Sequence, residues 1–293
     1  MTQLTDLFRP EFDFVRHGLL AGLIIAIVCA YLGVYVVLKR IVFVGAALAE
    51  LSTVGVALSF LPLVAHLGFL AQMDSHTTRP LFLALVMVIL GVIFFAQHFG
   101  GQEIPREAII GVTYGAATAF AILFLSVSPG AEKEALDLIQ GNILTIPPEA
   151  IRHLLFFAVP IAVVHLLLFK EFVLVSYDAE MARTLGFQAR VIELLFYLTL
   201  GLMIAVAIEV VGTLLVFGYL VIPAVAALKV TRRLQPAFAI AVGLAGIATV
   251  LGIYASSWQG SNIPMGPAVV GAAALLLALV WPAAALARRA TTT

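Results

Sequence analysis

The residues best suited to chemistry are a few acids and histidines that lie within or beside long apolar stretches. Glu50 follows ten residues after Arg40, which places it about 15 Å along an apolar helix. Insertion of a charged acid into the membrane at that depth costs about 2.5–3.5 kcal/mol of free energy unless the acid faces water or a partner. Two roles are therefore open for Glu50. It could contact a cation in a transport pathway, or it could pack between helices with its carboxylate hydrogen-bonded to Ser52, Thr53 or a neighbouring helix.

Other candidates lie near the ends of the apolar stretches. Glu209 is expected at the outer tip of a hairpin, either as a solvated turn residue or as a residue that receives a cation. His66 and His76 flank a loop with Asp74, and these side chains could contact a hydrated cation. The alternative is that they are ordinary interfacial residues, because no histidine pair has the i, i+4 spacing of helical metal ligands.

The composition excludes a water-soluble protein. Of the 293 residues, 63% are hydrophobic and 11% are charged, and the mean hydropathy is +1.13, whereas soluble domains average about 25% charged residues. Zero net charge argues against a nucleic-acid partner. The sole cysteine, Cys29, cannot form an internal disulfide or a cysteine metal cluster. The sequence contains no P-loop, zinc-protease or nucleophile-elbow motif, so it offers neither an ATP site nor an obvious hydrolytic site.

Apolar stretches of membrane-spanning length recur along the whole chain. They predict an all-α fold, a polytopic transmembrane helix bundle that forms a single domain over residues 1–293 and starts with an interfacial segment, residues 1–17. The expected number of spans is nine, with eight or ten possible, because one stretch contains Glu50 and two others nearly touch. The stretches cover about residues 18–38, 41–61, 80–97, 108–127, 153–169, 191–208, 210–228, 237–257 and 265–287.

The basic residues are distributed unevenly between the two sides of this bundle. Eleven of the sixteen Lys and Arg residues fall on one side, which the positive-inside rule assigns to the cytoplasm. Nine spans then place the N-terminus outside and the C-terminus inside. The cytoplasmic set is Lys39, Arg40, Arg106, Lys170, Arg183, Arg190, Lys229, Arg232, Arg233, Arg288 and Arg289.

Two loops predict short helices of their own. Residues 128–152 contain an amphipathic stretch that we expect to lie on the outer surface. In the cytoplasmic loop 170–190, Asp178 can cap a helix that runs from Ala179 to Leu185 and ends at Gly186. Such a helix would expose charged side chains, so it is either a docking element for a soluble partner or a surface helix without one.

The stretch YDAEMARTLGFQAR, residues 177–190, closely resembles a loop of metal-type ABC-importer permeases. Asp178, Ala182 and Gly186 fill the family pattern D-x-x-x-A-x-x-x-G. Further stretches resemble the same family in the same order, so that the resemblance covers about residues 15–285. These stretches are GVYVVLKR (33–40), GNIL (141–144), VGTLLV (211–216), LVIPA (220–224) and IPMGP (263–267).

The resemblance implies the inner-membrane permease subunit of an ATP-driven importer for zinc, manganese or iron in a bacterial plasma membrane. It implies a homodimeric pathway, an external solute-binding protein, and a separate ABC ATPase subunit that carries the ATP, so that this chain binds no cofactor. Residues 177–188 would be the coupling helix that contacts the ATPase. The residues assigned to this contact are Asp178, Glu180, Ala182, Arg183 and Gly186.

The second span departs from the family pattern. The family carries an Asp and a His one helical turn apart, and here the matching positions are Ala46 and Glu50. Glu50 therefore stands as the candidate metal contact, while zinc, manganese, iron and a non-metal cargo all stay open. An ion-coupled secondary transporter, in which Glu50 binds the coupling proton, is the alternative from another class.

Overall fold

The computed structural model describes residues 13–66, 68–74, 78–98, 104–128, 146, 148–256 and 263–290. Within these residues the chain forms helices and no strands, and nine helices are long and apolar enough to cross a membrane. The all-α fold and the expected nine spans are thereby confirmed. The nine are α1 (Asp13–Leu38), α2 (Val42–Ser59), α4 (Thr78–His98), α5 (Arg106–Ser126), α7 (Pro148–Leu167), α10 (Ala189–Val211), α11 (Thr213–Val230), α12 (Leu234–Ser256) and α13 (Met265–Ala290).

Among the described residues, four short helices lie between the spans. α3 (Pro62–Ala65) and the 3₁₀ helix η3 (Gly68–Gln72) follow α2, while α8 (Phe169–Tyr177) and α9 (Ala179–Thr184) lie between α7 and α10. The described residues divide into two compact units, each assembled from separate stretches of the chain. One unit takes its residues from 1–40, 140–152 and 210–293, and the other from 41–139 and 153–209.

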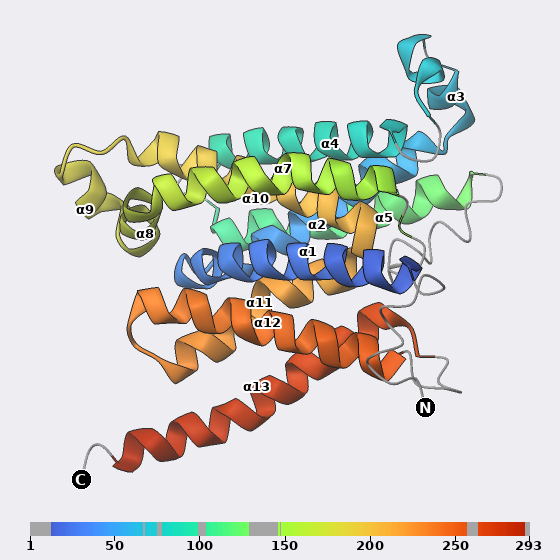
Figure 1. Ribbon diagram of the computed structural model, residues 1–293. Coiled ribbons are helices and arrows are strands. Elements are labelled where there is room, and N and C mark those ends of the chain that lie inside the picture. The colour runs from blue at the N-terminus through green and yellow to red at the C-terminus, as the bar shows by residue number, and fades with distance from the viewer. Residues whose placement is uncertain are drawn as a thin grey trace. The chain divides into compact units, whose positions relative to one another are not determined.

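The first unit is built from α1, α11, α12 and α13. α1 packs along α11 and α12, and α13 packs against the same two helices (Figure 1). Cys29 of α1 is fully buried in this unit. The Tyr219 and Thr249 hydroxyl oxygens, from α11 and α12, lie 2.6 Å apart. Such a buried hydrogen bond joins two helices that are mostly apolar.

Gly33 allows α1 to approach α11 closely, and we expect its replacement by alanine to disrupt the first unit. A Cβ atom at Gly33 would collide with the Leu220 backbone of α11, which no rotamer change can relieve. Overpacking of this kind costs about 1–3 kcal/mol. Gly33→Ala should therefore lower the thermal unfolding temperature and the yield of purified protein.

The matched control for this prediction is Gly243→Ala in α12. A Cβ atom there would have no neighbour within 4 Å, and alanine is the better helix former. Thermal unfolding of both variants in the same detergent makes the comparison. Equal unfolding temperatures for the two variants would show that the close approach of α1 and α11 does not depend on Gly33.

In the second unit, α2 packs against α4 and α5. Gly55 of α2 lies against the α4 backbone, where a Cβ atom would meet Leu83 and Ala84. The two partners of α2 are not equally covered by protein, because α5 is the most exposed of the nine spans. In its apolar window 17% of the residues are buried, against 72% in α2. α8 and α9 lie at one end of this unit and α3 lies at the opposite end (Figure 1).

Gly212 separates two spans that nearly touch in the sequence. It is the single residue between α10 and α11, and its φ of 79° lies in the left-handed region. Glycine reaches that region without the steric cost that a Cβ atom imposes. The break at Gly212 explains why residues 189–230 form two helices rather than one long span.

Candidate functional site

Glu50 lies in the middle of α2, on a side that faces α5. The side chain is partly buried, and Thr118 of α5 lies within hydrogen-bonding reach of its carboxylate. The Thr118 hydroxyl also donates to the carbonyl oxygen of Tyr114 at 2.9 Å. Because a hydroxyl has one proton to donate, Thr118 cannot fully satisfy both acceptors, and Glu50 keeps acceptor capacity for another partner.

The sequence left open whether Ser52 or Thr53 would bind Glu50, and neither does. Thr53 donates to the carbonyl oxygen of Ala49 at 3.1 Å, and the buried Ser52 hydroxyl has no hydrogen-bond partner in the described part of the chain. Ala46 and Glu50 lie one turn apart and are both partly exposed, whereas residues 47–49 between them are buried. The two positions that depart from the family pattern therefore share one accessible face of α2.

Glu50 does not belong to a preformed cluster of metal-ligating side chains in the described part of the chain. Among the residues that the structure describes, no three His, Cys, Asp or Glu side chains come together as a metal site.

Glu209 lies in the last turn of α10, just before the α10–α11 connection at Gly212, so its position near the tip of a hairpin fits the expectation. The alternative of a solvated turn residue is wrong, because Glu209 is helical and partly buried. The helix continues to Val211 because the break falls on Gly212. The carboxylate is partly buried, and its Oε2 atom has no hydrogen-bond partner among the described residues. An acid at a helix C-terminus is also unfavourable beside the negative end of the dipole. Its role as a cation contact stays a prediction.

The outer loop between α2 and α4 is described only in part. His66 ends α3, and its Nδ1 atom lies 2.6 Å from the carbonyl oxygen of Pro62. The exposed Asp74 follows η3, and its backbone oxygen accepts a hydrogen bond from Arg79 N at 3.0 Å. His76 lies outside the described residues, as does most of the amphipathic stretch expected within 128–152. Contact of His66, Asp74 and His76 with a cation stays a prediction.

The short helix expected after Asp178 is confirmed as α9. One carboxylate oxygen of Asp178 accepts hydrogen bonds from the backbone N–H groups of Glu180 and Met181, at 3.0 and 2.9 Å. Gly186 ends the helix with a φ of 87°. The N–H of Gly186 bonds to Arg183 O and that of Phe187 to Ala182 O, which is the Schellman pattern.

α9 has one buried face and one exposed face. Ala182 is fully buried against Val175 of α8 and Ala189 of α10. Glu180 and Arg183 lie on the outer side of the helix, as expected. Two apolar side chains on the exposed side were not predictable from the sequence, because each is equally compatible with the buried face of an amphipathic helix. These are Met181, 53% exposed, and Leu185, 58% exposed.

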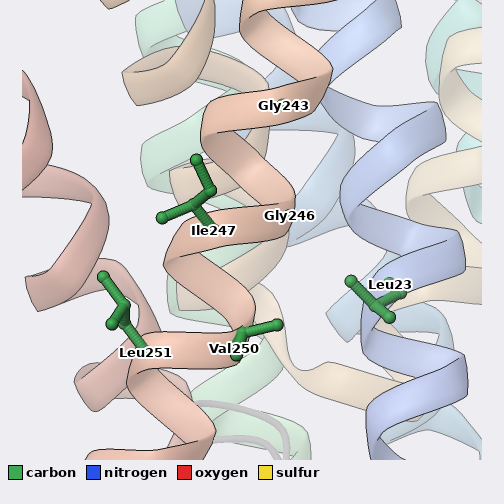
Figure 2. Close-up of a pocket in the computed structure, with 6 residues that line it drawn as sticks. All are labelled: Leu23, Gly243, Gly246, Ile247, Val250 and Leu251. Carbon is green, nitrogen blue, oxygen red and sulfur yellow. The ribbon is translucent and has the colours of Figure 1, made fainter.

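The first unit has an apolar groove on its surface between α1 and α12. Leu23 of α1 lines this groove with Ile247, Val250 and Leu251 of α12, beside Gly243 and Gly246. Val250 extends toward Leu23, and the groove has a volume of about 430 Å³ (Figure 2). Its lining carries no polar side chain. The groove therefore offers no ligand for a cation, and a lipid-facing surface is sufficient to explain it.

The nine candidate spans of the described residues define a multi-pass membrane protein. The sequence profile of the ABC 3 transport family matches residues 11–283. The chain belongs to this family. It is 24% identical over 260 residues to the manganese import system permease protein ScaB of Streptococcus parasanguinis, covering 89% of this chain and 87% of that protein. It is 26% identical over 251 residues to the chelated iron transport system membrane protein YfeC of Yersinia pestis, covering 85% and 80%.

A solved structure has the same fold. PsaBC from Streptococcus pneumoniae in complex with Fab superposes with a TM-score of 0.79, at 22% identity and with 94% of each chain covered. The expected resemblance to metal-type ABC permeases is thereby confirmed over nearly the whole sequence.

Proposed function

We propose that this chain is the permease subunit of an ATP-driven importer for a divalent metal in a bacterial plasma membrane. The observation that carries the proposal is the position of Glu50, which of the described acids lies nearest the middle of a span. Carboxylate oxygens are favoured ligands for hard and borderline cations. The manganese and iron transport named for the relatives agrees with such a cargo.

The pathway is proposed to form between two copies of the chain. Gly111 and Gly115 of α5 have open space beside them, because a Cβ atom added at either glycine would have no neighbour within 4 Å. Small residues four apart let membrane helices approach closely. Thr118 lies one turn further along α5 and beside Glu50, so a second copy at this face would bring two Glu50 carboxylates to one pathway.

The ATPase is proposed to bind at α9. This short helix is capped at both ends and packs through Ala182 against α8 and α10. Its other side exposes both charged and apolar side chains. Three basic residues of this region, Lys170, Arg183 and Arg190, favour a cytoplasmic location. In this orientation the N-terminus lies outside with the external binding protein, and the C-terminus lies inside.

Reconstitution tests the proposal directly. The chain is purified with its ATPase, placed in proteoliposomes with the binding protein, and supplied with manganese, iron or zinc. We expect uptake that requires ATP and one of these metals. Uptake driven by a proton gradient without the ATPase would identify a secondary transporter instead. ATP-dependent uptake of another solute, with no uptake of any of the three metals, would show that the cargo has changed.

A further inference from the structure

A buried aromatic cluster in the second unit joins α7, α8 and α10. His165, near the end of α7, is fully buried. Its ring stacks on Phe172 of α8, with centroids 4.4 Å apart and planes 12° from parallel. It also meets Phe196 of α10 edge-on at 6.1 Å. This contact could not be foreseen from the sequence, because a histidine near the end of a span is usually interfacial.

A hydrogen bond to its own helix holds the His165 ring in this orientation. Nδ1 lies 3.0 Å from the carbonyl oxygen of Ile161, and a carbonyl oxygen can only accept, so Nδ1 carries the proton. The opposite ring atom, Nε2, lies 3.5 Å from the Thr199 hydroxyl oxygen of α10, whose proton is shared between the carbonyl oxygens of Leu195 and Phe196 at 2.9 and 3.0 Å. The ring is therefore fixed to its own helix on one side and faces α10 on the other.

The aromatic cluster is connected to α9 through α8. Phe172 is part of α8, which leads into α9 through Asp178. Beyond it, Val175 of α8, Ala182 of α9 and Ala189 of α10 form a second buried cluster. The two clusters together attach α8 and α9 to the ends of α7 and α10. Close-packed side chains resist deformation, so a displacement of α9 would be passed to both spans.

We propose that His165 is a positioning residue for energy coupling, which holds α8 and α9 to α7 and α10 so that movement imposed on α9 reaches the spans. This inference rests on the proposed function, in which an ATPase binds α9. A positioning role of His165 in coupling differs from a purely structural role in one measurable respect. Loss of the contact should reduce the amount of metal imported for each ATP hydrolysed, even in the fraction of the complex that is correctly assembled.

Three substitutions separate the contributions of the ring. His165→Ala removes the stack, the hydrogen bond to Ile161 and the contact with Thr199. His165→Phe keeps a stacking ring without the hydrogen bond to Ile161. Thr199→Val removes the hydroxyl that lies near Nε2, together with its bonds to the α10 backbone. In the reconstituted complex we expect the ratio of metal imported to ATP hydrolysed to fall by about fivefold or more in His165→Ala, which is a typical size for coupling between sites. In His165→Phe and Thr199→Val this ratio should fall less.

Phe156→Ala is the control, because Phe156 is an aromatic residue of the same helix with 72% of its side chain exposed. Its ratio of metal imported to ATP hydrolysed should equal that of the unaltered chain. An unchanged ratio in all three His165 and Thr199 variants would overturn the inference, even where the yield of complex falls.

Hydrogen exchange on the purified permease supplies a test that does not depend on transport. His165→Ala and His165→Phe should increase amide exchange across residues 169–184, whereas Phe156→Ala should not. Exchange that is the same in all variants would contradict the inference. If the unaltered complex shows no ATP-driven uptake, the proposed function fails, and the exchange measurement still decides whether His165 holds α8 and α9.

Discussion

Replacement of Glu50 by glutamine is expected to reduce metal uptake by at least about tenfold, the lower end of what even an outer-shell partner contributes to metal affinity. Glutamine has nearly the same shape, and its amide oxygen can still accept from Thr118, which lies beside Glu50. Packing of α2 against α5 should therefore persist. What is lost is the negative charge and one of the two carboxylate oxygens that a cation would use. ATP-dependent uptake in proteoliposomes measures the effect.

Glu149→Gln provides the matched control, because it makes the same chemical change at the exposed start of α7. Glu149 is paired with Arg152 at 3.1 Å, and exposed pairs of this kind contribute little to stability. Its uptake should equal that of the unaltered chain. Both variants should also retain the ATPase on purification. Full uptake by Glu50→Gln would show that Glu50 only packs against α5 and does not meet the cargo.

Replacement of Met181 by glutamate is expected to release the ATPase while the permease still folds. Met181 is exposed on α9, whereas its neighbour Ala182 is buried. A charge there meets water in the isolated permease, but it would have to be desolvated in an interface with a partner. We expect little or no ATPase to remain bound during affinity purification, and uptake to fall with it.

The control is Leu63→Glu on α3, at the opposite end of the same unit (Figure 1). Leu63 is also an exposed apolar residue of a short helix, with 79% of its side chain accessible. This variant should retain the ATPase in normal amount. If Leu63→Glu lost the ATPase and Met181→Glu kept it, the ATPase would bind at the α3 end, and the proposed orientation of the chain would be reversed.

The sequence was sufficient for features that depend on local interactions. A span requires about 20 apolar residues in a row, which can be read directly, and the nine spans followed from this. α9 was predictable because Asp178 and Gly186 act on backbone groups within a few residues of themselves. Glu50 stood out because a charged group in an apolar run has few favourable surroundings.

Contacts between helices could not be read in the same way. Thr118 approaches Glu50 from another helix, and His165 meets Phe172 and Phe196 in a buried cluster. In a soluble protein the apolar face of each helix would reveal its buried side. Here the lipid-facing and protein-facing sides are both apolar, so the sequence does not distinguish them. The helical position of Glu209 was missed because one residue, Gly212, makes the whole connection between α10 and α11.

The sole cysteine has a practical consequence for following this protein at work. Cys29 is fully buried within α1, where a maleimide reagent in water has no access to its thiol. The natural chain therefore serves directly as an unlabelled background for site-specific spectroscopy. A single cysteine introduced at position Glu180 on α9 would carry a fluorophore or spin label alone, and its signal during nucleotide turnover would time the movement of that helix.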